Sequence, residues 1–455
     1  MSFNREIELK LRFTQEIFWD DLKKKIGRHF EIVSKTEQSL QLESFYYDTP
    51  EKDLRERGIS YRIRHQKSEL IATIKADGEI EGGLHSRNEW SANIEQNKPD
   101  LTPFIELLEK RGINHLQIQD NLLPIFNTSF FRNEVQLCAG ENSIVELALD
   151  KGSIVNQNKE LPINELELEL KKGEVASVFD IAAKLIEYYP LVPESHSKYS
   201  RGLLLDKKNA ARIPAQDQRL TTNTDEDAPK SYYMIFEKAL RVAAEAQERL
   251  LSEGYTFENF FALRDALQKI VSILSFGETY HIWSVDEELT QSYNKTTVSI
   301  RGIRDLEDET SQQEMMELVS SGRYMSALYR LWACLLREKA KSDKSLDLAV
   351  GEWIERTGKE LYAMDIRNIF TEEIAKDEFL EKMENTLNIA LCVKGYLYKE
   401  IEGWMAEGTA VRDVLLSYWL KSDKKNNDET AILTKIVFDK LWRSFIKKTE
   451  RMMLL

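Results

Sequence analysis

The sequence contains few cysteines, prolines and histidines, with 3, 9 and 6 of them among 455 residues. Cys138, Cys334 and Cys392 are far apart and odd in number, so neither a disulfide framework nor a cysteine-based metal site is expected. No proline follows Pro229, and proline is the residue that most strongly interrupts a helix. The second half of the chain can therefore form long, uninterrupted helices.

Long hydrophobic runs and an excess of basic residues are also missing. No apolar stretch approaches the roughly 20 residues that span a membrane, and the N-terminus lacks the pattern of a secretory signal. We therefore expect a cytoplasmic protein that does not associate with membranes. The net charge of −14 argues against a nucleic-acid partner. An anionic ligand would need locally concentrated positive charge or a metal ion.

The hydrophobic pattern changes across residues 206–231, a polar, aperiodic segment with two prolines that is typical of a linker. Before this segment, apolar and polar residues alternate with the period of a β-strand. The alternating segments are 5–13, 39–48, 59–65, 70–76, 84–92, 127–137, 143–151 and 163–171. Helices are expected between them at about 15–28, 101–111 and 174–189. This succession of strands indicates an antiparallel sheet or a barrel.

After the linker, apolar residues recur with the 3.6-residue period of a helix. Three such stripes are Ile235, Ala239, Val242, Ala246 and Leu250; Met325, Leu328, Trp332 and Leu335; and Leu380, Met383, Leu387 and Leu391. This half is expected to be an all-α helical bundle. The predicted fold class is therefore α+β, with a strand-rich domain over 1–205 and a helical domain over 232–455.

Several predicted strands carry acidic residues on one face. Glu6 and Glu8 alternate with apolar residues in "REIELKLRF" at 5–13, and Glu165, Glu167 and Glu169 form an uninterrupted row in "ELELELK". Like charges two residues apart repel one another, so such a row is costly unless cations lie beside it. Mg²⁺ or Mn²⁺ is the natural counter-charge for a cluster of hard carboxylate oxygens.

Basic residues occupy the corresponding faces of other strands, including Arg62 and Arg64, Lys75 and Arg132. Arginine binds phosphate oxygens two at a time, so a site with both kinds of residue suits a metal–phosphate complex. A barrel with these faces turned inward would contain a polar tunnel. One such strand alone is more typical of a solvated surface, and the set by itself leaves both interpretations open.

The order of short motifs resembles the CYTH superfamily, the triphosphate tunnel metalloenzymes. "EIELK" at 6–10 resembles the ExExK signature of that family. The other matching segments are "YYDTP" at 46–50, "LRERGISYRIR" at 54–64, "TIKADG" at 73–78, "GGLHSRNEW" at 82–90, "FFRNEV" at 130–135, "VELALDKG" at 145–152, "ELELELKKG" at 165–173 and "SKYSRG" at 197–202. The chain most resembles the two-domain bacterial CYTH–CHAD inorganic triphosphatases.

The resemblance implies an eight-stranded antiparallel β-barrel tunnel with flanking helices, followed by a CHAD-like helical domain. It implies that a divalent metal, Mg²⁺ or Mn²⁺, binds Glu6, Glu8 and Glu169, with Glu167 and Asp150 in support. The residues implied to bind triphosphate are Lys10, Arg62, Arg64, Lys75, Arg132 and Lys198. Arg87, Glu89, Glu165 and Arg201 fall at matching positions. Ile7, Leu9 and Leu11 would then face outward.

The function that the resemblance implies is hydrolysis of tripolyphosphate to pyrophosphate and phosphate. The alternatives are a nucleotide or thiamine triphosphatase with the same site, and a non-catalytic sensor of polyphosphate or nucleotides. CHAD domains are named for conserved histidines, whereas residues 216–455 contain only His281. This departure argues against polyphosphate binding by the helical half.

Overall fold

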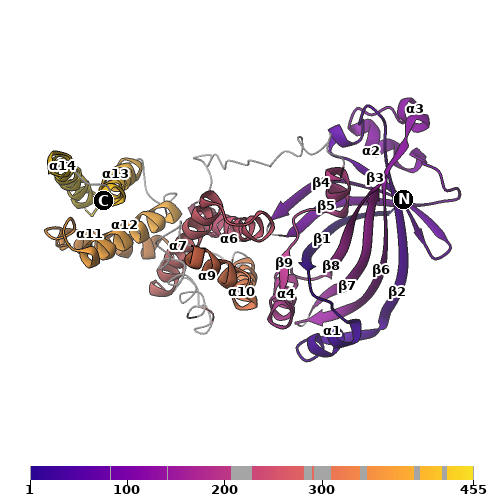
Figure 1. The fold of residues 1–455 in the computed structure, drawn as a ribbon, viewed down its shortest axis with the longest axis horizontal. Helices are drawn as coiled ribbons and strands as arrows, with labels where there is room; N and C mark the ends of the chain where they lie inside the picture. The colour runs from indigo at the N-terminus through magenta and orange to yellow at the C-terminus, as the bar shows by residue number, and fades with distance from the viewer. Residues whose placement is uncertain are drawn as a thin grey trace. The chain divides into compact units, whose positions relative to one another are not determined.

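The computed structural model describes residues 2–81, 83–140, 142–205, 228–280, 289, 291, 309–338, 346–393, 400–422 and 428–453 (Figure 1). The chain divides into two compact units. The first comprises Met1–Arg219, Gln247–Tyr255 and Glu307–Leu336, and the second comprises Leu220–Ala246, Thr256–Leu306 and Arg337–Leu455. Most of the predicted linker, residues 206–227, lies outside the described residues. The predicted domain boundaries therefore stay a prediction.

The first unit is built on a closed antiparallel barrel. Its strands are β1 (Ser2–Phe13), β2 (Glu31–Asp48), β3 (Ser60–Gln66), β4 (Glu69–Glu81), β5 (Leu84–Ile94), β6 (Leu123–Ala139), β7 (Ser143–Asn156) and β8 (Lys159–Lys172). They are hydrogen-bonded in the order β5-β4-β3-β2-β6-β7-β8-β1, and β1 also pairs with β5, which closes the circle. A short strand, β9 (Leu191–Pro193), adds to β1. The predicted eight-stranded barrel is confirmed.

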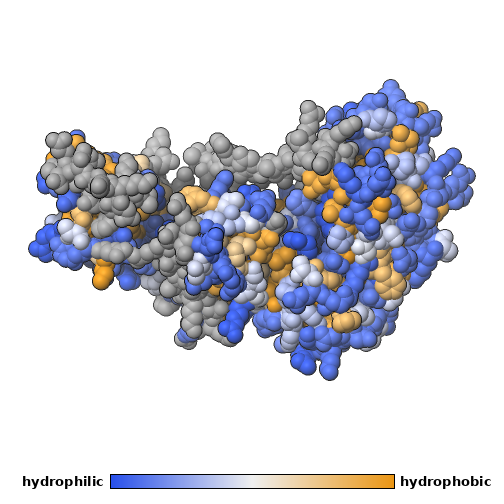
Figure 2. Space-filling view, viewed as in Figure 1, coloured by the Kyte–Doolittle hydropathy of each residue, from blue (hydrophilic) through white to orange (hydrophobic). Residues whose placement is uncertain are grey.

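Alternation along β1 separates an apolar outer face from a charged inner face. Leu9 and Leu11 are fully buried, and helix α4 (Ala176–Tyr188) packs on β1, β7 and β8. Glu6, Glu8 and Lys10 occupy the opposite face and line the barrel interior. The face of the barrel seen in Figure 2 is predominantly hydrophilic. The apolar outer face of β1 is thus buried beneath α4, while charged side chains line the interior of the barrel.

Other helices of this unit cover the outside of the barrel. They are α1 (Trp19–Ile26), α2 (Ile105–Lys110) and α3 (His115–Ile118), with the short 3₁₀ turns η1 (Arg55–Arg57), η2 (Thr102–Phe104) and η3 (Gln119–Asn121). Outward residues of β3 and β4, such as Ile63 and Ile74, form one apolar cluster with Phe104 and Leu108. Burial of this outer face leaves the inner face of the strands to line the tunnel.

Helix α5 (Lys198–Leu204) follows β9 and packs against β6 and β7. Its approach to β6 is close because Gly202 has no side chain. A Cβ atom at that position would lie 2.3 Å from Cε2 of Phe126. The first two residues of α5, Lys198 and Tyr199, line the interior cavity. The helix is therefore part of the wall of the site.

Helices from the second half of the sequence also belong to the first unit. These are α9 (Glu309–Val319), most of α10 (Gly322–Glu338) and the end of α6 (Ala228–Glu253). Trp332 of α10 stacks on Phe179 of α4 with ring centroids 5.1 Å apart and planes 8° apart. Both side chains are almost completely buried. The compact unit around the barrel thus extends beyond residue 205 in sequence.

The second unit contains only helices among its described residues. These are the first part of α6, α7 (Phe257–Thr279), α11 (Leu346–Tyr362), α12 (Glu373–Val393), α13 (Glu400–Ser422) and α14 (Asp428–Met452). Helix α13 packs on α14, and α7 packs on α12. The predicted all-α character is confirmed. No helix in the described part of the chain has both the length and the apolar content of a membrane span.

Candidate active site

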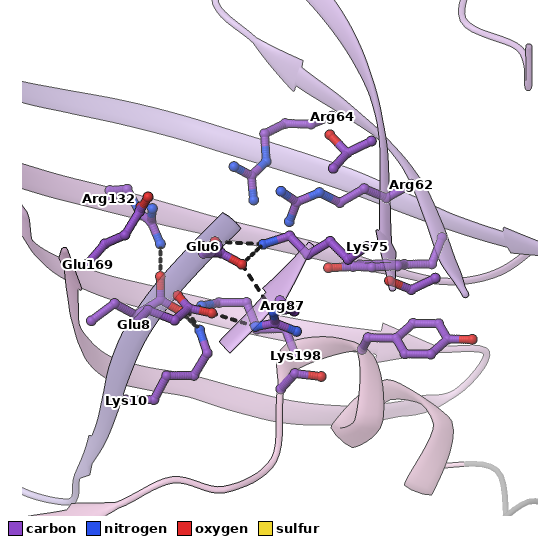
Figure 3. Close-up of a pocket in the computed structure, with 16 residues that line it drawn as sticks. Glu6, Glu8, Lys10, Arg62, Arg64, Lys75, Arg87, Arg132, Glu169 and Lys198 are labelled. Atoms are coloured by element: carbon purple, nitrogen blue, oxygen red, sulfur yellow. Dashed lines mark hydrogen bonds and ion pairs between the residues drawn. The ribbon is translucent and has the colours of Figure 1, made fainter. Parts of the chain in front are cut away.

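The barrel interior is lined almost entirely by charged and hydroxyl-bearing side chains (Figure 3). Of the residues predicted from sequence, those that line this cavity are Glu6, Glu8, Lys10, Arg62, Arg64, Lys75, Arg87, Arg132, Glu167, Glu169 and Lys198. The other four form ion pairs at the edge of this cavity. Glu89 binds Lys75, Asp150 and Glu165 bind Lys198, and Arg201 binds Glu165. The structure thus brings the whole predicted set into one barrel, and the role of each residue stays a prediction.

One end of the acidic row is neutralised by a lysine of the chain itself. The Lys198 ammonium lies 2.8 Å from a carboxylate oxygen of Asp150, of Glu165 and of Glu167. These carboxylates lie close enough together to hold a metal ion. Burial opposes the charged form of Lys198, but the three carboxylates raise its pKa. The ammonium therefore supplies part of the counter-charge at this end of the acidic row.

Arg132 and Lys10 extend this buried network. The Arg132 guanidinium donates to Asp150 at 2.7 and 2.6 Å and also to Glu167. The Lys10 ammonium lies 3.0 Å from Glu8 and also binds Glu167. Burial favours the neutral form of Glu167, but its cationic neighbours, Lys10 foremost, hold its pKa well below the usual range. Glu167 therefore stays ionised.

Glu6 and Glu8 lie on β1 and bind cations from two other strands. The Lys75 ammonium lies 2.5 Å from Glu6 and 2.7 Å from Glu89. The Arg87 guanidinium is 3.0 Å from Glu6 and also binds Glu8. Figure 3 shows these side chains converging inside the barrel. Several of the predicted metal-binding and phosphate-binding groups thus form ion pairs with one another.

Glu169 has a different environment. It is paired with Glu8 in the β1–β8 register, and Lys171, at 2.8 Å, is its ion-pair partner among the described residues. Burial raises the pKa of Glu169 to about 7; Lys171 opposes this rise, while Glu6 and Glu8 add to it. An additional cation beside Glu169 would therefore favour its ionised form.

Arg62 and Arg64 are the exceptions among the interior cations. Neither forms an ion pair with any carboxylate among the residues that the structure describes. The buried Nε of Arg62 has no hydrogen-bond partner, and Nε of Arg64 donates to Ser44 Oγ at 3.2 Å. Burial, with Arg62 and Arg132 nearby, lowers the pKa of Arg64 to about 10. Two adjacent guanidinium groups thus have no carboxylate within ion-pair distance among the described residues, and Glu89 interacts with both from farther away.

Sequence reasoning missed the aromatic residues of the site. The Phe130 ring lies 6.0 Å from Cζ of Arg64, 5.7 Å from Cζ of Arg132 and 5.0 Å from Nζ of Lys198. Tyr46 and Tyr199 also line the cavity. The sequence contained a usable signal, because Phe130 is two residues from Arg132 and shares its face of β6. No role was predicted for these aromatic residues from the sequence.

Comparisons with known proteins agree with this barrel. A family model of the CYTH domain matches residues 4–203. An inorganic triphosphatase of Haemophilus influenzae is 29% identical over 302 residues, covering 63% of this chain and 79% of that protein.

Among solved structures, a Hippeastrum protein with a dominant triphosphatase activity is 17% identical with a TM-score of 0.30, covering 43% of this chain and 94% of that one. The CHAD domain of Ricinus communis is 11% identical with a TM-score of 0.37, covering 51% of this chain and 95% of that one. The residues that match the CYTH domain model, 4–203, coincide with the part of the chain that forms the closed barrel, so this part of the chain resembles a CYTH domain.

Proposed function

We propose that this protein is a metal-dependent inorganic triphosphatase that hydrolyses tripolyphosphate to pyrophosphate and phosphate inside the barrel. The observation that carries the proposal is the pair of interior arginines, Arg62 and Arg64, that form no ion pair with a carboxylate in the described part of the chain. Guanidinium groups bind phosphate oxygens two at a time, and these two have no ion pair that must break before they do so. The Haemophilus influenzae relative, named an inorganic triphosphatase, supports the choice of substrate.

The carboxylates of the site offer the oxygen donors that a hard divalent cation prefers. Glu6, Glu8 and Glu169 supply only oxygen ligands, which Mg²⁺ and Mn²⁺ prefer. In this structure, Lys75 and Arg87 form ion pairs with Glu6. The positive charge of each side chain also suits it to bind phosphate. We infer an exchange of partners, in which the carboxylates turn to the metal and the basic side chains to the substrate. This exchange explains why both kinds of residue share one barrel.

Hydrolysis requires a water oxygen to bond to a terminal phosphorus while the bridging P–O bond breaks and pyrophosphate leaves. The proposed role of Arg62 and Arg64 is to hold the phosphate chain, and Arg87 and Lys75 would neutralise charge that develops on its oxygens. A bound divalent ion would supply further charge neutralisation and acidify a water molecule. Arg62 and Arg64 lie on β3 and have no ion pair to break before they bind phosphate, so they need less rearrangement than Lys75 and Arg87.

The alternative substrates carry the same triphosphate with an organic group attached. A nucleotide or thiamine triphosphate would need space for that group beside the tunnel, and the aromatic residues Tyr46 and Tyr199 stand in the cavity wall. Their rings are 5.6 Å apart and Tyr46 stacks on Phe126 at 4.6 Å, so they contact one another. This mutual packing favours a linear substrate without a ring.

The test is the rate of phosphate release from tripolyphosphate, ATP, thiamine triphosphate and pyrophosphate, each with Mg²⁺ or Mn²⁺. We expect kcat/KM for tripolyphosphate to exceed that for every other compound by at least about tenfold, or 1.4 kcal/mol in the barrier. A higher value for ATP or thiamine triphosphate would replace the proposed substrate. Binding of tripolyphosphate without any turnover would instead identify a sensor.

A further inference from the structure

The segment that carries Lys198 into the barrel is short and is held from several sides. Strand β9 ends at Pro193, and Lys198 begins α5 four residues after Glu194. The backbone N–H of Glu194 donates to the Lys10 carbonyl at 2.9 Å, and His85 Nε2 donates to the Glu194 carbonyl at 3.0 Å. Glu194 is thereby fixed to both β1 and β5.

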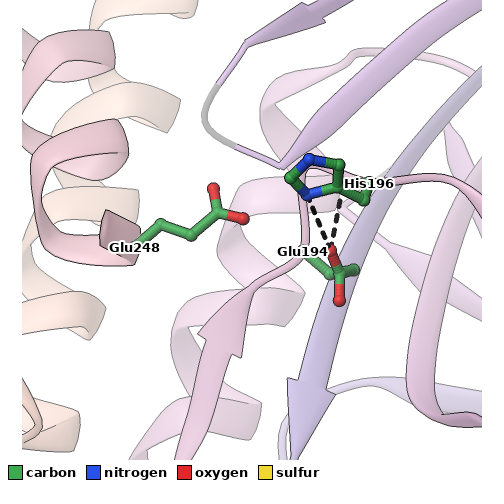
Figure 4. A group of neighbouring side chains, drawn as sticks. All are labelled: Glu194, His196 and Glu248. Atoms are coloured by element: carbon green, nitrogen blue, oxygen red, sulfur yellow. Dashed lines mark hydrogen bonds and ion pairs between the residues drawn. The ribbon is translucent and has the colours of Figure 1, made fainter. Parts of the chain in front are cut away.

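The next residue, Ser195, is held by a carboxylate from the second half of the chain. Its backbone N–H donates to one oxygen of Glu248 at 3.2 Å, and its hydroxyl donates to the other oxygen. Glu248 lies near the end of α6, within the compact unit that contains the barrel. Figure 4 shows its side chain extending from the helix toward the segment of Glu194 and His196.

Two further contacts hold the residues between Ser195 and Lys198. The His196 N–H donates to the Glu194 carboxylate at 2.9 Å. The Ser197 hydroxyl then caps α5 by accepting from the Ser200 N–H at 3.1 Å, so the next residue, Lys198, begins the helix. Lys198 reaches three buried carboxylates at 2.8 Å. A change in the position of Ser195 would therefore displace the Lys198 ammonium.

We propose that Glu248 is a positioning residue for the triphosphatase site, through which the second half of the chain fixes Lys198 in the barrel. This inference rests on the proposed function for its effect on catalysis, but the anchoring of Ser195 stands independently of it. The Glu248 carboxylate is engaged at both oxygens by Ser195, which favours anchoring over metal binding by the neighbouring Glu194, His196 and Glu248. Displacement of a binding group by about 1 Å can slow catalysis 100-fold.

The test compares full-length Glu248→Ala and Glu248→Gln with Glu253→Ala, a matched control at an exposed position of the same helix. Hydrogen exchange of the backbone amides in 194–200 is measured first, because it does not depend on activity. We expect faster exchange in Glu248→Ala, an intermediate rate in Glu248→Gln, which keeps one acceptor oxygen, and no change in Glu253→Ala. Unchanged exchange in Glu248→Ala, or equal acceleration throughout the barrel, would overturn the inference.

Tripolyphosphate hydrolysis by the same three proteins is measured next. We expect Glu248→Ala to lower kcat by about tenfold or more, with Glu248→Gln recovering most of the loss and Glu253→Ala matching the wild type. Altered exchange with unchanged kcat would show that the anchor does not serve catalysis and would refute the positioning role. If the wild type releases no phosphate, the proposed function fails, and the exchange data still decide whether Glu248 anchors the segment.

Discussion

Glu8→Gln is expected to reduce metal-dependent kcat/KM for tripolyphosphate by at least about 100-fold, or 2.7 kcal/mol. Glu8 is 3% exposed and lies between Arg87 and Lys10 in the ligand-free barrel. Glutamine keeps the shape of the side chain but removes the negative charge that a divalent ion requires. The measurement is the initial rate of phosphate release as a function of Mg²⁺ concentration.

The matched control for this change is Glu160→Gln, on the same strand as Glu169 but at an exposed position. It should leave the rate and its Mg²⁺ dependence unchanged. Activity of Glu8→Gln above about a tenth of the wild-type value would show that Glu8 is not a metal ligand, since the loss in the barrier would then be under 1.4 kcal/mol.

Arg64→Met should have opposite effects on activity and on stability. Substrate binding and turnover should fall by at least about 100-fold, because the guanidinium is proposed to contact phosphate in both the ground state and the transition state. The free energy of unfolding of the ligand-free protein should rise by about 1 kcal/mol, because Arg64 is half-buried beside Arg62 and Arg132 without a carboxylate partner. Urea unfolding and steady-state kinetics measure the two effects.

The control is Arg57→Met, at an exposed arginine whose Nη1 donates to the Asp53 carbonyl at 2.8 Å. It should change activity little and should not stabilise the protein. A loss of stability in Arg64→Met would show that the contacts of the guanidinium with Ser44 and Phe130 outweigh its repulsion from Arg62 and Arg132. Unchanged kinetics would place Arg64 outside the substrate site.

The strands and their orientation were predictable because both depend on local alternation. The eight predicted segments correspond to β1 to β8, and Leu9 and Leu11 do face the core while Glu6 and Glu8 face the interior. Most strand ends extend beyond the predicted ranges; β2, for example, begins at Glu31 rather than residue 39. Pairing with neighbouring strands lengthens a strand past the point where its own pattern becomes irregular.

The pairing of charges could not be predicted, because it depends on strand register and on segments distant in sequence. The acidic row predicted a cation, and the structure shows that Lys198, 29 residues after Glu169, neutralises one end of that row. That Arg62 and Arg64 form no ion pair with a described carboxylate likewise follows only from the closed barrel. The spacing of apolar residues predicts which face of a helix is buried but not its partner. It therefore did not predict that α10 packs on α4 through Trp332 and Phe179.

The most direct test of the proposed activity is a ³¹P NMR time course of tripolyphosphate with the full-length protein, with Mg²⁺ or Mn²⁺ and then with excess chelator. We expect pyrophosphate and phosphate to appear in equal amounts with the metal and neither to appear with the chelator. Turnover that persists in chelator would contradict the assigned metal, and intact tripolyphosphate in the presence of either metal would contradict the proposed function itself.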